Sequence, residues 1–375
     1  MASTPGSTPA GLLFALLQSH GTATSTQYDT VAIAGLDGHM IASATFAPMP
    51  QPTTGCMGAI LQPSAHTAGG KVFYGDAKGV VRSLAANGVT NVVTTFPMTS
   101  NQQMLSFAVS PDGTRLLGTV YTVPTNAWPC DGSASNAGYT FDTYTATSGS
   151  PSSLVDHQTW SKPQNALALT GWDAVGPIGT YPTVWASQGG GPASSLGVLV
   201  RVDAATGKPF APFSDPSSCL VWDSVQSGAF VCTGGSVTTG GGTAQQKVAQ
   251  SVSVRDTGGT ELWHFTATGQ NAPFSPILAP DGLHAMICCN DLDLADSHEL
   301  LIGRDGAQVN LASGFRAYGW LDSATMVGWL NTSPLNQGPF PLAFVAANAP
   351  GTASSLGIVG HFVGTVSGSE SPLEV

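Results

Sequence analysis

The chain has 375 residues, of which only 9% are charged, and its 22 acidic and 11 basic residues give a net charge of -11. The lysines and arginines are scattered singly, so no basic patch is visible that could neutralise nucleic-acid phosphates or hold an anionic membrane. The longest apolar run near the start, residues 11–17, is too short to span a bilayer. We therefore expect neither nucleic-acid binding nor direct membrane insertion of this segment.

The opening of the chain bears on its compartment. Residues 2–9 are rich in Ser, Thr, Pro and Gly, as a stalk after a removed signal or anchor would be, and no basic segment precedes the first apolar run. A polar, weakly charged surface suits the cell envelope or the medium. We expect an extracytoplasmic protein, secreted or membrane-anchored, with a cytosolic location as the alternative. We also expect flexible segments at 1–10 and 369–375 around a single domain at 11–368.

Short apolar stretches separated by Gly, Pro, Asn and Asp recur along the whole chain, and no sustained helical period is present. The first three predicted strands are 12–18, 30–36 and 39–46. Further along, Pro-Asp-Gly turns at 111–113 and 280–282 each join two apolar stretches into a hairpin, because Pro fixes φ, Asp caps the turn and Gly accepts a positive φ. The fold is therefore predicted to be all-β.

Asn-Gly, Asp-Gly and Gly-Gly turns mark a second series of hairpins. The two series alternate with a spacing typical of four-stranded propeller blades. The predicted blades are residues 55–98, 103–160, 164–213, 217–268, 272–313 and 314–360. The N-terminal region supplies only three strands, and residues 362–366 can supply the fourth by pairing with them, which removes two sheet edges. This predicts a seven-bladed β-propeller with four-stranded blades, closed by the C-terminal strand. Six blades plus a terminal hairpin is the alternative.

Three segments resemble known propeller repeats. Residues 110–117 (Ser-Pro-Asp-Gly-Thr-Arg-Leu-Leu) resemble the repeats of TolB-like and WD40-like bacterial propellers. Residues 200–208 and 255–265 resemble the outer hairpins of PQQ-type repeats. The whole layout is similar to that of uncharacterised secreted or membrane-anchored bacterial propellers. The resemblance implies a fold and no particular activity, because fold alone does not fix function.

The chain contains six cysteines. Cys219 and Cys232 lie at the two ends of one predicted hairpin, where neighbouring strands can bring two cysteines within disulfide distance. We predict a disulfide between them, with two buried free thiols as the alternative. The other cysteines give a second candidate bridge and an adjacent pair expected to pack without bonding: Cys56 with Cys130, and Cys288 beside Cys289.

No residue is assigned a catalytic, cofactor-binding or metal-binding role. The histidines are dispersed, and a Gly-x-Ser-x-Gly nucleophile turn is missing from the sequence. The acidic stretch with Asp291, Asp293 and Asp296 departs from an EF-hand loop, because Ala295 stands where a ligand is needed and no glycine follows. We expect a solvated loop there and no cofactor, with calcium as the weaker alternative.

Trp128 and Trp185 lie in irregular Gly/Ser/Asn-rich insertions, where binding residues are often found. An aromatic side chain on such a loop could stack on a sugar or a peptide.

We therefore expect a non-enzymatic propeller that binds a protein or ligand at the cell envelope, with a channel mouth lacking clustered pKa shifts. The alternative is a hydrolase or lyase acting on a glycan or lactone, with His, Asp or Glu meeting at the channel. A third reading, packing into an assembly, predicts an extended apolar patch on the rim.

Overall fold

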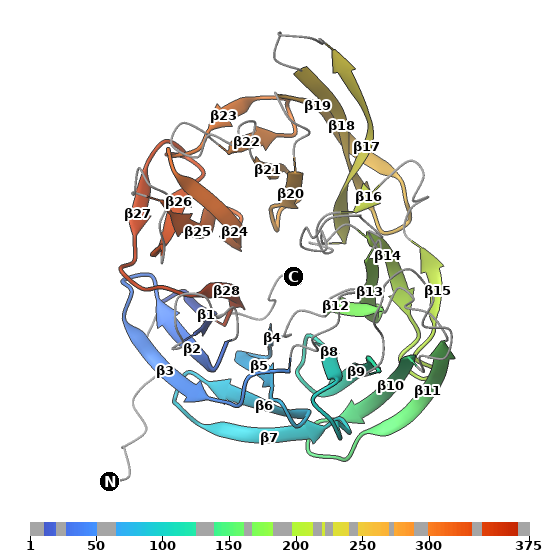
Figure 1. Ribbon diagram of the computed structural model, residues 1–375. Helices are drawn as coiled ribbons and strands as arrows, with labels where there is room; N and C mark the ends of the chain where they lie inside the picture. The colour runs from blue at the N-terminus through green and yellow to red at the C-terminus, as the bar shows by residue number, and fades with distance from the viewer. Residues whose placement is uncertain are drawn as a thin grey trace.

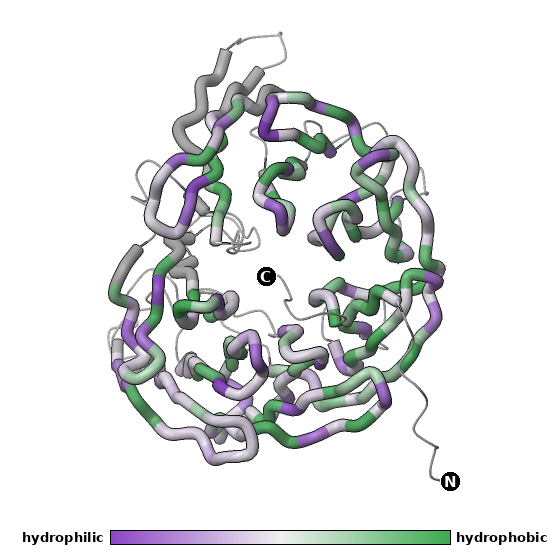
Figure 2. The backbone as a smooth tube through the Cα atoms, turned by 180° about the vertical axis from the view of Figure 1, so that it is seen from behind, coloured by the Kyte–Doolittle hydropathy of each residue, from purple (hydrophilic) through white to green (hydrophobic). Residues whose placement is uncertain are grey.

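The computed structural model describes residues 11–19, 28–50, 65–124, 139–160, 167–182, 197–212, 220–221, 228–239, 247–269, 274–288, 299–331 and 340–366. Over these residues the chain is all-β and forms seven four-stranded blades arranged in a ring (Figure 1). Hydrophobic stretches recur in the blades all round the ring (Figure 2). None of the described residues belongs to a helix that could cross a membrane.

The first blade combines both ends of the chain, and the second and third follow in chain order. From the channel outward, their strands are β28 (His361–Thr365), β1 (Leu13–Gln18), β2 (Thr30–Gly35) and β3 (Met40–Thr45); β4 (Ala65–Ala68), β5 (Lys71–Gly75), β6 (Val80–Ala85) and β7 (Thr90–Thr95); and β8 (Gln103–Val109), β9 (Arg115–Thr122), β10 (Tyr139–Thr147) and β11 (Ser153–Trp160).

The fourth to seventh blades continue the ring in the same sense. Their strands are β12 (Ala168–Trp172), β13 (Pro177–Pro182), β14 (Gly197–Val202) and β15 (Pro209–Pro212); β16 (Leu220–Val221), β17 (Ala229–Thr239), β18 (Lys247–Asp256) and β19 (Glu261–Gly269); β20 (Phe274–Leu278), β21 (His284–Cys288), β22 (Leu300–Gly303) and β23 (Gln308–Asn310); and β24 (Phe315–Asp322), β25 (Thr325–Leu330), β26 (Leu342–Ala346) and β27 (Ala353–Ser355).

The ring is closed by the C-terminal strand, as the sequence predicted. Strand β28 pairs with β1 in antiparallel register, with Phe14 opposite Thr365 and Leu17 opposite His361. The Val366 amide continues the pairing by donating to the carbonyl of Leu13. The seven-bladed prediction is confirmed, and the six-bladed alternative is wrong because β28 is an integral strand of the first blade.

The core lies between the blades, and burial falls from the channel side toward the rim. All seven residues of β8, the inner strand of the third blade, are buried, whereas all three residues of the outer strand β23 are exposed. Aromatic side chains fill the contacts between blades. The Phe96 ring, at the end of the second blade, lies so close to Gly118 on β9 that a Cβ there would meet ring atoms at 2.5 Å.

One face of the disc, the turn face, carries the turns from first to second and from third to fourth strands. These turns share one device, in which an Asp or Asn side chain accepts the amide N–H two residues further on. Such caps are formed by Asp37, Asn87, Asp112, Asp173, Asp203, Asp256, Asp281, Asp305 and Asp322. The predicted Asp-Gly and Pro-Asp-Gly turns are among them, and Gly38, Gly113 and Gly282 adopt the positive φ that those turns need.

The opposite face, the loop face, carries the connections from second to third strands and from each blade to the next. Antiparallel topology puts the ends of β9 and β13 and the beginnings of β10 and β14 on this face. The insertions predicted to carry Trp128 and Trp185 join these strand ends. Both tryptophans lie outside the described residues, so their role as binding aromatics stays a prediction.

The fourth and fifth blades depart from the regular pattern. Gly197 on β14 pairs with Val221 on β16, which links the two blades into one sheet, while β15 pairs with the other end of β14. Strands β17 and β18 are long and project beyond the outline of the disc (Figure 1). Cys232 on β17 is fully buried, and its sulfur lies 3.3 Å from the hydroxyl oxygen of Ser253. The register places Val221 opposite it, and Cys219 lies outside the described residues, so their pairing stays a prediction.

Candidate functional site

Three partly exposed rings meet on the loop face, at the seam between the seventh and first blades. His361 begins β28, Tyr318 lies on the neighbouring inner strand β24, and Tyr28 stands just before β2. The Tyr318 ring meets His361 nearly edge-on, with 4.6 Å between centroids and 65° between planes. The Tyr28 ring lies 5.9 Å from His361 at 31°. We call these three residues the mouth cluster.

Local backbone pairing explains why the mouth cluster forms. His361 lies opposite Leu17 in the β1–β28 register. The Asp29 amide donates to the carbonyl of Gln18 at 3.0 Å, which holds the chain beside Tyr28 against the end of β1. The Gln18 side chain in turn donates to the carbonyl of Val359 at 2.7 Å. Ring closure therefore brings together residues that are far apart in the sequence.

The polar atoms of the mouth cluster lack hydrogen-bond partners among the residues that the structure describes. Within the described part of the chain, no hydrogen bond engages the hydroxyls of Tyr28 and Tyr318 or the ring nitrogens of His361. These atoms are also absent from the buried polar atoms that lack a partner, so they are not sealed from water. Polar groups at a recessed place usually find partners within the fold. Their availability here is typical of a binding site.

Burial keeps the mouth cluster uncharged near neutral pH. It lowers the pKa of His361 to about 4, because the imidazolium would lose its hydration. It raises the pKa of Tyr318 to about 12, with Tyr28 adding to the rise, and it raises the pKa of Tyr28 itself. The site therefore presents two phenols and a neutral imidazole.

A second histidine lies on β4, the inner strand beside β28. Burial lowers the pKa of His66 to about 4, opposed by a hydrogen bond with the Phe107 backbone. Its Nε2 is buried without a hydrogen-bond partner, and its ring meets that of Phe107 edge-on at 5.2 Å. Consecutive inner strands β24, β28 and β4 thus place Tyr318, His361 and His66, all neutral, toward the loop-face end.

The seam between the sixth and seventh blades holds a buried acid. Glu299, only 3% exposed, accepts the amide N–H of Ala317 on β24 at 2.8 Å. Burial raises the pKa of Glu299 to about 7, although the Ala317 bond and the Arg316 charge oppose the rise. A carboxyl so enclosed is out of reach of a substrate, and its bond across the seam makes it a link between blades.

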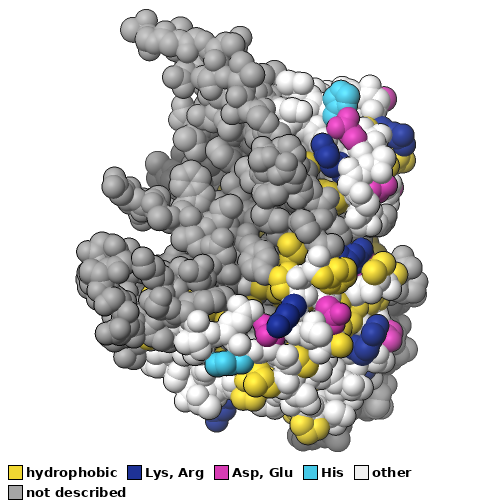
Figure 3. Space-filling view, turned by 90° about the vertical axis from the view of Figure 1, so that its right-hand side faces the viewer, with side chains coloured by type: hydrophobic (Ala, Val, Ile, Leu, Met, Phe, Trp, Pro, Cys, Tyr) yellow, Lys and Arg dark blue, Asp and Glu magenta, His cyan; other side chains and the backbone are white. Residues whose placement is uncertain are grey.

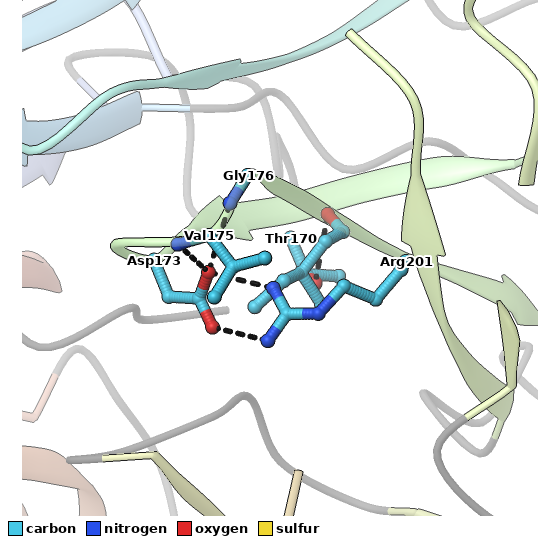
Figure 4. Close-up of polar contacts among 6 residues, drawn as sticks. Thr170, Asp173, Val175, Gly176 and Arg201 are labelled. Carbon is cyan, nitrogen blue, oxygen red and sulfur yellow. Dashed lines mark hydrogen bonds and ion pairs between the residues drawn. The ribbon is translucent and has the colours of Figure 1, made fainter. Parts of the chain in front are cut away.

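Charged groups on the turn face are satisfied internally, as the fourth blade shows (Figure 4). Arg201 on β14 binds Asp173 through two bonds, Nη1 to Oδ1 at 2.6 Å and Nη2 to Oδ2 at 2.7 Å. The amides of Val175 and Gly176 also donate to Oδ1. Burial alone would raise the pKa of Asp173, but Arg201 and these amides outweigh it and lower the pKa. This ion pair fastens the β12–β13 turn to β14.

The rim carries single exposed apolar side chains on its outer strands. They include Val92, Leu154, Phe210, Leu262 and Val309, each in a different blade. In the side view of Figure 3, hydrophobic side chains are interspersed with charged ones. An extended apolar patch, which packing into an assembly would require, is not visible among the residues described on that side.

The site differs from the sequence-based expectations in one respect. The binding reading predicted a channel mouth without clustered pKa shifts, yet His361, Tyr318, Tyr28 and His66 all carry them. The largest cause is burial in each case, not a nearby charge. No group of three His, Cys, Asp or Glu side chains in the described ranges could hold a metal ion. The acidic stretch at 291–296 lies outside those ranges, so the calcium alternative stays untested.

Sequence reasoning missed the mouth cluster, because its members are 43 to 333 positions apart and match no motif. Their shared signal is position: Tyr318 and His361 begin or lie early in the inner strand of a blade, where side chains come near the channel. This positional signal can be recognised only after β28 has been assigned as the closing strand.

Comparisons with known proteins show the fold of the chain alone. No protein-family model matches the chain, and no curated protein matches it in sequence. The solved structures similar to it include an oligogalacturonate lyase in complex with manganese, at 11% identity over 85% of this chain and 82% of that one, with a TM-score of 0.50. A putative TolB from Agrobacterium tumefaciens aligns at 10% identity over 80% and 81%, with a TM-score of 0.32. At such identities the likeness concerns the fold alone, and the seven-bladed ring agrees with the predicted resemblance to TolB-like and WD40-like propellers.

Proposed function

We propose that the protein is a non-enzymatic, extracytoplasmic β-propeller that binds a ligand or protein on its loop face. The observation that carries this proposal is the mouth cluster. It offers unengaged hydrogen-bonding groups on inner strands, at the face where the longest connections emerge. The turn face, by contrast, is built from tight turns whose carboxylates are used in capping. Binding sites of propeller-like scaffolds favour loops held by a rigid frame.

Two features support the extracytoplasmic location. Only 9% of residues are charged, which leaves a surface of Ser, Thr, Asn, Gln and Gly. We propose that Cys232 forms the predicted disulfide with Cys219, and disulfides persist mainly in oxidising compartments. A cell-envelope or secreted location fits both. We infer a partner met in that compartment.

The hypothesis that the protein is not an enzyme rests on the contacts within the mouth cluster. His361 meets Tyr318 by ring contact at 4.6 Å, without a hydrogen bond that could relay a proton. Glu299, the one acid with a pKa near neutrality among the residues described, is enclosed at the blade seam. A hydrolase or lyase would need an acid or base whose pKa lies near the working pH, whereas the pKa of His361 is lowered to about 4. The mouth is therefore better suited to holding a molecule than to cleaving it.

Two exposed valines on opposite faces allow a matched test. Val359, 43% exposed, lies on the loop face beside Gln18, and Val175, 75% exposed, lies in a turn of the turn face. Labelled protein is applied to arrays of oligosaccharides and peptides, and bound compounds are recovered for mass spectrometry. We expect Val359→Arg to abolish binding and Val175→Arg to leave it unchanged, with the bound compound intact. Binding lost only in Val175→Arg, or a compound recovered in cleaved form, would overturn the proposal.

A further inference from the structure

We propose that the mouth cluster binds an uncharged, hydroxyl-rich ligand, namely a neutral oligosaccharide. This inference rests on the proposed binding function and names the class of ligand. It follows from three properties of Tyr28, Tyr318 and His361: their lack of charge, their two-way hydrogen bonding and the arrangement of their rings.

The absence of charge in the cluster argues against an anionic ligand. A carboxylate or phosphate placed among two phenols and a neutral imidazole would lose water without gaining a counter-charge. The nearest basic group on β24 is Arg316, which is 7% exposed and donates to the carbonyl of Phe315 at 3.0 Å. The acid next to Tyr28 in the sequence, Asp29, accepts the hydroxyl of Thr30 at 3.0 Å. Neither belongs to the mouth cluster.

The hydrogen-bonding chemistry of the cluster matches sugar hydroxyls. A phenol donates one hydrogen bond and accepts others, and a neutral imidazole has one donor and one acceptor nitrogen. A sugar hydroxyl also donates and accepts, so each can satisfy the other in either direction. These protein atoms have no partner in the described part of the chain, so a ligand need not displace an internal bond.

The rings supply the other half of sugar recognition, an apolar surface. Tyr28 and Tyr318 contact His361 from two sides, at 5.9 Å and 4.6 Å between centroids. Aromatic rings at a recessed site contribute contact area at little cost in side-chain entropy. The C–H faces of a pyranose ring can pack on them while its hydroxyls reach the polar atoms. Val359, which is 43% exposed and lies two residues before His361, adds an apolar side chain on the same face.

Calorimetry with defined oligosaccharides tests the inference. The panel contains neutral gluco-, galacto-, manno- and chito-oligosaccharides, each with an acidic or phosphorylated counterpart of the same length. The Tyr28→Phe/Tyr318→Phe variant keeps the rings and removes both hydroxyls. The Tyr28→Ala/Tyr318→Ala variant removes the rings as well, and thermal melting establishes that each variant is folded. Because the Phe variant keeps the packing, it remains informative if the Ala variant does not fold.

We expect the wild type to bind a neutral member and not its acidic counterpart. The Phe variant should bind it about thirtyfold more weakly, the value for loss of two neutral hydrogen bonds, and the Ala variant should show no binding. Preference for the acidic counterparts, or no binding of any sugar, would overturn the inference. Sugar binding lost in Val359→Arg but unchanged in the Phe and Ala variants would overturn it while leaving the proposed function standing. If Val359→Arg does not change binding on the arrays, both this inference and the proposed function are wrong.

Discussion

The ring of His361 stands nearly edge-on to that of Tyr318, with centroids 4.6 Å apart, across the seam where the last blade meets the first. The two residues lie on neighbouring inner strands, β28 and β24, which ring closure brings together. Closure of the propeller and assembly of the mouth cluster are therefore one event. A ligand that binds this cluster would also hold the two ends of the ring together.

The two histidines at the loop-face end of the inner strands, His361 and His66, should make the fold sensitive to acid. His361 and His66 have pKa values lowered from 6.5 to about 4 by burial. Their contribution to stability is present above pH 6.5 and is lost as the pH falls toward 4, because the unfolded chain binds the protons more readily. We expect His361→Gln to reduce the loss of melting temperature between pH 6.5 and 4. The exposed His39→Gln serves as control, and equal acid sensitivity in all three proteins would contradict this account.

Glu299 should act in the opposite sense. Its pKa rises from 4.5 to about 7 in the folded chain, so the folded state holds the proton more tightly. The stabilisation is fully present below pH 4.5 and is lost as the pH rises through 7. Glu299→Gln keeps an oxygen for the Ala317 amide but cannot ionise. We expect the melting temperature of the wild type, relative to this variant, to fall steadily from pH 4.5 to 8. A constant difference across that range would show that Glu299 does not titrate as described.

Packing between the second and third blades depends on a residue without a side chain. A Cβ at Gly118 would meet the Phe96 ring at 2.5 Å, so Gly118→Ala should destabilise the fold by about 1–3 kcal/mol, the usual cost of overpacking. Adding Phe96→Leu should recover part of that loss by making room. Gly11→Ala is the control, because nothing lies within 4 Å of its added Cβ. Denaturant unfolding measures the wild type, these variants and Phe96→Leu alone, and additive losses in the double variant would exclude the clash as the cause.

The two Asp–Arg ion pairs should contribute differently to the free energy of unfolding, because their arginine side chains differ in burial. The Arg201 side chain is 9% exposed and binds Asp173 through two bonds, whereas the Arg82 side chain beside Asp76 is 33% exposed. Arg201→Leu should cost about 3 kcal/mol of unfolding free energy, because it removes a buried guanidinium that makes two charge-assisted hydrogen bonds. Arg82→Leu should cost less, because the more exposed Arg82 makes one such bond to Asp76, although Asp76 itself is only 10% exposed. Equal losses in chemical denaturation would show that burial does not set the difference.

The architecture was predictable because each blade carries its own local signals. Pro-Asp-Gly at 111–113 and Asp-Gly at 37–38 specify turns through the φ preferences of single residues. The N-terminal region contains only three predicted strands, so a fourth strand from elsewhere in the chain was expected to complete its blade. The mouth cluster was not predictable in this way. His361 and Tyr28 carry no local pattern, and their meeting depends on the pairing of β28 with β1. Burial, which sets their pKa values, is likewise a property of the whole ring.

The central claim is that β28 closes the ring and assembles the loop-face site, and truncation tests it most directly. A chain ending at residue 360 lacks β28, and a control ending at residue 366 keeps it. We expect the shorter chain to lose cooperative thermal unfolding or to melt many degrees lower, because the apolar surfaces of Phe14 and Leu16 lose their cover. The control should melt like the full chain. Equal melting of all three proteins would contradict closure by β28 and the site built upon it.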